Sequence, residues 1–182
     1  MLSLLACVGT APDSSSDSAT DSTVDSGDRD PIRDIDPSTI PAGPSPCREA
    51  ILVRVTEVVD GDTAYVAWAD QTWKTEKVRF IGIDTPETYD DSCWADEAKD
   101  AARQKLDDEL VWMTFDATCE DTYDRTLAYL WKTAEDFVNL EIVREGHAWA
   151  FPYEPNTTFE GDFQSAEVQA HDEGIGMWAD CY

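Results

Sequence analysis

The fold is decided by residues 51–68, which read ILVRVTEVVDGDTAYVAW. The first half of this stretch, residues 51–59, is rich in β-branched side chains with partial alternation, a pattern typical of a strand. Residues 60–62, Asp-Gly-Asp, are turn formers, and residues 63–68 have the composition of a returning strand. The stretch therefore predicts an antiparallel β-hairpin at the start of the folded part.

The segments downstream of this hairpin alternate between strand and helix patterns. Further strands are expected at residues 77–83, 111–116 and 126–132. Apolar residues at helical spacing are expected to form helices within residues 94–110, 133–146 and 157–170. Five strands, one interposed helix and two C-terminal helices predict an α+β fold, a small five-stranded β-barrel with three α-helices.

The chain is strongly acidic. It has 182 residues, with 13 Lys and Arg against 39 Asp and Glu, which gives a formal net charge of −26. At first sight this charge argues against polyanionic partners such as nucleic acid. A content of 42% hydrophobic residues and seven Trp excludes a wholly disordered acidic chain.

The N-terminal residues differ in composition from the rest. Residues 1–7 end in Leu4-Leu5-Ala6-Cys7, which resembles the lipobox of a bacterial lipoprotein signal with Cys7 as the lipidated residue. Residues 8–46 are rich in Asp, Ser, Thr and Pro, and predict a disordered tether. We therefore expect an exported protein, either tethered to the cell envelope or secreted, with a folded domain over residues 47–182.

Four further cysteines lie in the folded part. An even number of cysteines in an exported acidic domain favours two disulfides, for which three connectivities exist. Cys47 and Cys181 bracket the domain, so we predict the pairs Cys47–Cys181 and Cys93–Cys119. A metal site is the competing interpretation, but the sequence has no Cys-x-x-Cys.

Two acidic clusters could hold a cation. The first is residues 60–63, Asp-Gly-Asp-Thr, at the hairpin turn, and the second is residues 83–87, Ile-Asp-Thr-Pro-Glu, just past a strand. Carboxylates and a backbone carbonyl are the oxygen ligands that Ca²⁺ prefers. Arg79 and Arg125 lie near these clusters or in a later motif, and a cation beside two arginines is typical of a phosphoryl-transfer site.

The order and wording of these motifs resemble the staphylococcal nuclease (thermonuclease) family over about residues 51–179. The matching stretches carry the segments VDGDT, RFIGIDTPE, DTYDRTLAY, VN, VREG, YEPNTT and IGMW, which begin at residues 59, 79, 121, 138, 143, 153 and 175. The resemblance implies an OB-fold barrel with three helices. It also implies a Ca²⁺-dependent endonuclease acting on single-stranded or locally melted DNA and on RNA, with 5′ P–O cleavage that leaves 3′-phosphates.

The resemblance also implies roles for individual residues. Asp62 and Asp84 would ligate Ca²⁺ through carboxylates, and Thr85 through its backbone carbonyl. Glu87 would activate or orient the attacking water, and both roles stay open. The two implied phosphate ligands, whose forked donors suit the oxygens that gain charge in the transition state, are Arg79 and Arg125.

Four positions near the substrate depart from the family pattern or carry its aromatic contacts. Tyr123 is followed by Asp124 where the family has Gly, and Asp tolerates a positive φ better than most residues. Phe151 replaces a tyrosine while Tyr153 is retained, so stacking on a base is kept and one hydroxyl hydrogen bond is lost. We expect weaker substrate binding by a monomeric enzyme.

Two alternatives to a nuclease stay open. The acidic surface, Asp124, and Thr122 in place of the family's basic residue before the tyrosine also fit a catalytically weakened OB-fold binding module. The acidic N-terminal residues fit a binder of divalent ions with the domain as its scaffold.

Overall fold

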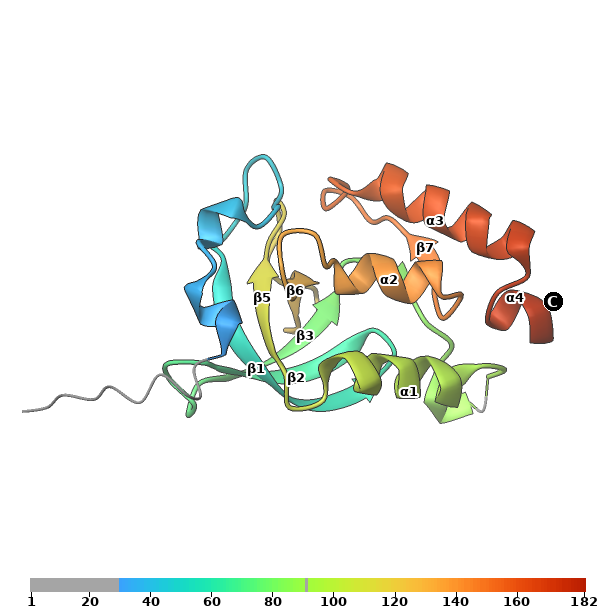
Figure 1. Cartoon of the computed structure of the whole chain (residues 1–182), viewed down its shortest axis with the longest axis horizontal. Helices are drawn as coiled ribbons and strands as arrows, with labels where there is room; N and C mark the ends of the chain where they lie inside the picture. The colour runs from blue at the N-terminus through green and yellow to red at the C-terminus, as the bar shows by residue number, and fades with distance from the viewer. Residues whose placement is uncertain (1–29, 91) are drawn as a thin grey trace, which may run out of the picture.

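The computed structural model describes residues 30–90 and 92–182, and a closed five-stranded barrel forms its centre (Figure 1). The barrel strands are β1 (Ile51–Asp60), β2 (Thr63–Trp68), β3 (Thr75–Phe80), β5 (Leu110–Thr114) and β6 (Thr126–Trp131). Around the barrel their order is β1-β2-β3-β6-β5. The β3–β6 pair is parallel and the other pairs are antiparallel. The predicted five-stranded barrel is confirmed.

Helices and a small second sheet pack around the barrel. The helices are α1 (Ala95–Leu106), α2 (Val138–Arg144), α3 (Glu160–Glu173) and the short α4 (Met177–Asp180). The second sheet pairs β4 (Gly82–Asp84) with β7 (Trp149–Phe151), and single 3₁₀ turns are η1 (Pro31–Asp34), η2 (Pro37–Thr39) and η3 (Thr88–Asp90). The three expected helices are present, with α4 in addition. Within the described residues, no helix has the length and apolar character needed to cross a bilayer.

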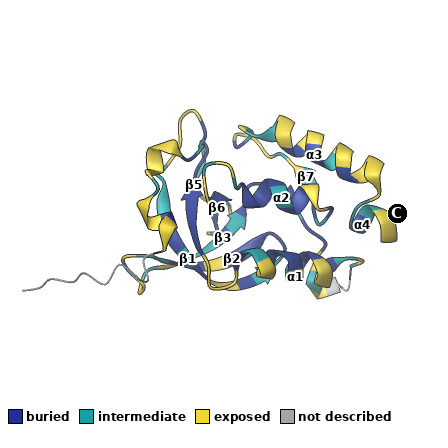
Figure 2. Cartoon of the chain, viewed as in Figure 1, coloured by how far each residue is buried: buried dark blue, intermediate teal, exposed yellow. Residues whose placement is uncertain are grey.

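The barrel interior is filled by the apolar side chains of its strands (Figure 2). Along β1 the inward residues Val53, Val55 and Val58 are buried, as the hairpin pattern predicts. All five residues of β5 are buried. Because successive strand residues point to opposite faces, burial of both faces requires a cover on the outside of β5.

Residues 30–46 provide this cover, which corrects the predicted boundary of the tether. Ile32 and Ile40 are buried in the core cluster. The Trp112 indole N–H donates to the carbonyl of Ile32 at 3.2 Å, and the Thr114 hydroxyl donates to the carbonyl of Pro41 at 2.7 Å. This segment was expected to be disordered because it is rich in Pro and Asp, yet two buried isoleucines and these hydrogen bonds hold it against β5. Residues 1–29, including Cys7, lie outside the described residues.

The predicted disulfide pairing is wrong. The structure pairs Cys47 with Cys119, with Cα atoms 5.7 Å apart, and Cys93 with Cys181, with Cα atoms 6.0 Å apart. Position in the sequence was a poor guide, because the barrel brings the start of β1 beside the segment before β6. The second disulfide joins the segment before α1 to the end of α4.

Candidate functional site

The two acidic motifs meet at the turn between β1 and β2. Asp62 is buried, and its Oδ2 accepts hydrogen bonds from the backbone N–H and the hydroxyl of Thr85, at 2.9 and 3.1 Å. Gly61 permits this approach, because a Cβ at that position would lie 2.7 Å from Cγ2 of Thr85. The segment after β4 is therefore fixed directly on the hairpin turn.

Arg79, on β3, joins the carboxylates of these two motifs. Its Nη2 lies 3.2 Å from Oδ2 of Asp62 and 2.6 Å from Oδ1 of Asp84. Its Nη1 donates to the backbone carbonyls of Phe80 and Ile83, at 2.9 and 2.7 Å. The arginine side chain is only 13% exposed, so both terminal nitrogens are held at fixed positions beside the two carboxylates.

Burial and crowding disturb the titration of two of these carboxyl groups. Burial and the neighbouring charge of Asp62 raise the pKa of Asp60 to about 6. Burial raises the pKa of Asp84 above its ordinary value, and the charge of Arg79 opposes this rise without cancelling it. A cation at this position would relieve the cost of holding these carboxylates charged together.

The second arginine, Arg125, is held by a short loop before β6. Asp121 accepts hydrogen bonds at Oδ1 from the backbone N–H groups of Tyr123 and Arg125, and at Oδ2 from Nε of Arg125 at 2.6 Å. Asp124 has a φ of 59°, the left-handed conformation expected where the family has Gly. One carboxylate thus fixes both the loop and the inner edge of the guanidinium.

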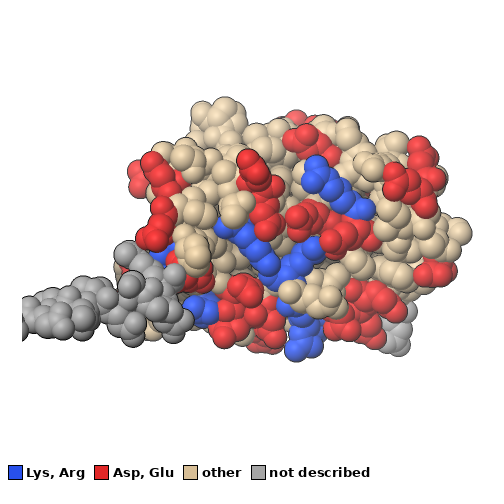
Figure 3. Space-filling model, viewed as in Figure 1, with Lys and Arg blue, Asp and Glu red and all other residues tan. Residues whose placement is uncertain are grey.

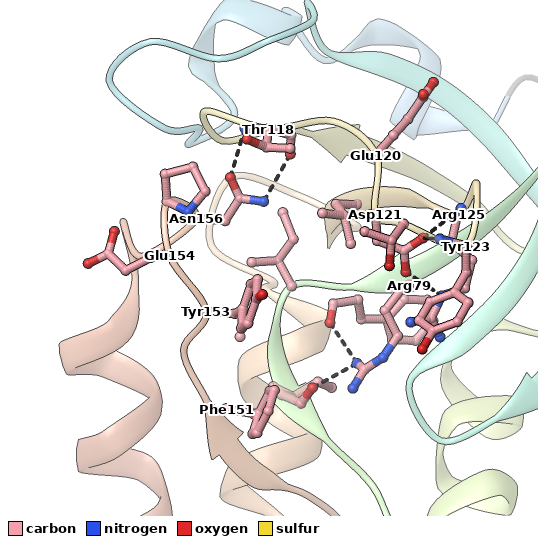
Figure 4. Close-up of a pocket in the computed structure, with 17 residues that line it drawn as sticks. Arg79, Thr118, Glu120, Asp121, Tyr123, Arg125, Phe151, Tyr153, Glu154 and Asn156 are labelled. Atoms are coloured by element: carbon pink, nitrogen blue, oxygen red, sulfur yellow. Dashed lines mark hydrogen bonds and ion pairs between the residues drawn. The ribbon is translucent and has the colours of Figure 1, made fainter.

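Arg79 and Arg125 line one cavity of about 590 Å³, together with exposed aromatic side chains (Figure 4). Tyr123 lies on the side of Arg125, and Phe151 and Tyr153 lie on the opposite side. These three side chains are 78%, 50% and 73% exposed. The Tyr123 ring already lies 5.6 Å from Cζ of Arg125, in a cation-π contact. Exposed aromatic side chains beside two guanidinium groups suit a ligand that combines a planar ring with a phosphate.

A buried polar network fixes the wall that carries Tyr153. The side chain of Asn156 accepts from the N–H of Thr118 at 2.8 Å and donates to its carbonyl at 2.9 Å. Asp116 Oδ2 accepts from the Tyr129 hydroxyl at 2.8 Å and from the N–H of Thr158 at 3.0 Å. Burial and the neighbouring carboxylate raise the pKa of the Tyr129 hydroxyl, which keeps it protonated as a donor.

The structure brings most of the predicted site residues together. The predicted phosphate and base contacts line the cavity: Arg79, Tyr123, Arg125, Phe151 and Tyr153. The predicted metal ligands Asp62, Asp84 and Thr85 form one hydrogen-bonded group with Arg79. Glu87 is exposed in the segment that follows β4 and is not among the residues lining the cavity.

Sequence reasoning gave no role to three carboxylates at this site. Asp121 holds Arg125, and its spacing of four residues from that arginine was the available signal. Glu120 and Glu154 line the cavity, and nothing in their local pattern distinguishes them from other surface acids. Their position depends on the barrel bringing two distant segments together.

Known proteins support the family suggested by these motifs. The family model described as "Staphylococcal nuclease homologue" matches residues 77–180. The thermonuclease of Staphylococcus hyicus is 35% identical over 130 residues, which span 69% of this chain and 75% of that protein. The chain belongs to the staphylococcal nuclease family. The thermonuclease of Staphylococcus intermedius is 33% identical over 128 residues, which span 68% and 74% of the two chains.

Relatives in the family extend beyond the staphylococcal proteins. Endonuclease YncB of Bacillus subtilis is 29% identical over 138 residues, which span 72% of this chain and 64% of that protein. The family's OB-fold barrel with α additions agrees with the observed architecture.

Proposed function

We propose that the protein is a nuclease that hydrolyses phosphodiester bonds of DNA and RNA at the cavity between β3, β6 and β7. One observation carries this proposal: Arg79 and Arg125 line the same aromatic cavity, and Arg79 contacts the two carboxylates Asp62 and Asp84. Two guanidinium groups match the equatorial oxygens of a phosphoryl transition state. Exposed Tyr and Phe side chains match unpaired bases, so single-stranded or locally melted strands are the proposed substrates.

The donor set fits Ca²⁺ as the cofactor. The proposed ligands are the carboxylates of Asp62 and Asp84 and the backbone carbonyl of Thr85, all hard oxygen donors. Within the described residues, no three His, Cys, Asp or Glu side chains are grouped for metal binding, so a site with two carboxylates needs the carbonyl and water. When bound, Ca²⁺ would supply positive charge to a phosphate oxygen.

The remaining roles belong to the protein's own side chains. Asp121 fixes Arg125 at Nε, and the two terminal nitrogens of Arg125 would donate hydrogen bonds to the phosphate. Glu87 is the proposed partner of the attacking water, which it would either orient or deprotonate. Cleavage at the 5′ P–O bond would leave 3′-phosphates. The proposed enzyme is a monomer.

A binding module without turnover is the second candidate. The terminal nitrogens of Arg79 contact the protein itself: two backbone carbonyls at Nη1 and two carboxylates at Nη2. Arg79 must give up part of this set before it can contact a phosphate. If it does not, the domain would bind a strand or Ca²⁺ but would not cut.

A cleavage assay separates the two candidates. The purified chain is incubated with a labelled single strand and Ca²⁺, with EDTA and with Mg²⁺, and product ends are tested for 3′-phosphate. The nuclease proposal predicts Ca²⁺-dependent cleavage that Arg125→Ala and Glu87→Gln abolish. Arg54→Ala is the matched control, because Arg54 pairs with Asp108 on an exposed edge outside the cavity. Ca²⁺ binding by calorimetry without cleavage would favour the binding module.

We also propose export. Two disulfides favour an oxidising compartment, and the Cys7 motif would add a lipid anchor. Mass spectrometry of the protein from a bacterial envelope fraction tests the anchor, since an unmodified N-terminal segment would refute it.

A further inference from the structure

The cavity has little positive charge to offer a long nucleic acid. Of the described Lys and Arg residues, only Arg79 and Arg125 line it. Each is already paired with a carboxylate at 2.6 Å, Asp84 for the first and Asp121 for the second. The positive charge that a strand meets on arrival is therefore largely neutralised by the protein itself.

The mouth of the cavity carries acidic side chains that point outward. Figure 4 shows the carboxylates of Glu120 and Glu154 directed away from the centre of the cavity. Glu120 is 67% exposed, and its nearest cation is Nη2 of Arg48 at 3.9 Å. Arg48 is held more closely by Glu76, at 2.9 Å, so it neutralises Glu120 only weakly.

Two basic residues elsewhere on the described surface are already engaged by neighbouring side chains. Lys105 is paired with Glu141 and Glu145, and Lys74 lies over the ring of Trp68. On the face shown in Figure 3, several Lys and Arg side chains gather near the middle and are surrounded by more numerous Asp and Glu. With 39 Asp and Glu against 13 Lys and Arg in the whole chain, a strand that extends beyond the cavity meets a predominantly acidic protein.

We propose that Glu120 and Glu154 select against long polyanions at low ionic strength, so that the site prefers short strands and needs salt to act on long ones. This inference rests on the proposed nuclease function. A short oligonucleotide places its few phosphates at the two arginines. A long strand also brings phosphates to the acidic rim, where each adds a repulsive contact.

Salt acts differently on the two parts of this surface. The screening length falls from about 30 Å at 0.01 M salt to about 8 Å at 0.15 M, so repulsion by exposed carboxylates weakens strongly. The contacts at the half-buried arginines are screened much less. Added salt therefore removes the obstacle to long strands while it keeps the phosphate contacts, the reverse of the usual loss of affinity for basic nucleic-acid-binding proteins.

The test compares two substrates over a salt series. Values of kcat/KM are measured for a thymidine trinucleotide and for a thymidine strand of about 60 nucleotides, from about 20 to about 500 mM NaCl with saturating Ca²⁺. We expect the value for the long strand to rise by roughly threefold to tenfold, within the usual range of electrostatic effects on association rates. The value for the trinucleotide should change by less than about twofold, and it also controls for any effect of salt on Ca²⁺ binding.

Charge-reversal variants locate the effect. Glu120→Lys with Glu154→Lys should convert the rise for the long strand into a fall. The matched control, Glu173→Lys with Asp180→Lys, makes the same change in net charge at exposed positions in α3 and α4, and should keep the rise. Glu173 ends α3, about 20 Å along the helix from its first residue.

The outcomes separate this inference from the proposed function. If the trinucleotide is cut and the long strand is cut best at low salt, the nuclease proposal stands and the salt inference is overturned. If both pairs of variants have the same effect, net charge rather than the rim is responsible, which also overturns it. If neither substrate is cut at any salt concentration, the proposed function itself fails.

Discussion

Replacing Asp121 with Asn is expected to weaken catalysis through Arg125. In the structure, Oδ1 of Asp121 accepts two backbone N–H groups, while Oδ2 accepts Nε of Arg125 at 2.6 Å. Asn keeps an acceptor at the first position and places an amide donor at the second, which cannot accept from Nε. The substitution therefore leaves the loop closed and releases one edge of the guanidinium.

The size of the effect follows from this one contact. A hydrogen bond to a charged group contributes about 1.5–3 kcal/mol, and solvent screening at the 27% exposed Arg125 side chain reduces this to about 1–2 kcal/mol. If that energy is used to orient Arg125 on the transition state, kcat/KM falls by about 5- to 30-fold. Loss of a negative charge near phosphate would act in the opposite direction.

A double-mutant cycle measures the coupling directly. Values of kcat/KM on a trinucleotide are determined for Asp121→Asn, Arg125→Ala and the double variant, with thermal unfolding as a check on the fold. Asp121→Asn should cost activity in the wild-type background and almost none when Arg125 is already Ala. Equal losses in both backgrounds, or a faster Asp121→Asn variant, would refute the positioning role.

Three further predictions concern stability. Cys93→Ser with Cys181→Ser opens a link between residues 88 positions apart and should lower the free energy of unfolding by about 4–5 kcal/mol in the chain-entropy model, measured in urea. Ile32→Ala should cost about 2–5 kcal/mol in the same assay, whereas a negligible loss would show that residues 30–46 do not contribute to the core. Burial would raise the pKa of Glu76, but hydrogen bonds from the Thr126 hydroxyl and the Arg48 guanidinium hold it below its ordinary value. Its contribution is therefore present above about pH 4.3 and is lost as the pH falls through the lower folded pKa, so Glu76→Gln should reduce the pH dependence of unfolding in acid.

The sequence predicted the parts of the fold that depend on local patterns. Residues 51–68 form the expected hairpin because β-branched residues flank an Asp-Gly turn. Barrel closure was not visible in the same way, because the parallel pairing of β3 with β6 joins strands more than 40 residues apart. The Cys47–Cys119 pair depends on the barrel, and the Cys93–Cys181 pair on the packing of the C-terminal helices, so order along the chain misassigned both.

The prediction of a disordered tether was wrong for residues 30–46, where a few apolar residues lie in a polar segment. Residues 30–46 have the composition of a linker, yet Ile32 and Ile40 bury against β5. The average composition of a segment does not reveal that two of its residues are spaced so that both pack against the same strand.

The sequence predicted the candidate site residues that lie in a recognisable local motif. It did not predict the residues that only the fold brings together. Arg79 and Arg125 were identified from their motifs, and the left-handed φ of Asp124 follows the expected tolerance of Asp. The acidic rim at Glu120 and Glu154 needed the fold, because it joins the segment before β6 to the segment after β7.

The most direct test of the account is cleavage of a labelled single strand by the purified chain, measured with Ca²⁺, with EDTA and after Arg125→Ala. The account predicts products with 3′-phosphates in Ca²⁺, no products in EDTA, and a loss of at least about 100-fold in the variant, comparable to removal of one transition-state donor. Absence of cleavage in Ca²⁺ by a correctly folded chain, or full activity of Arg125→Ala, would contradict it.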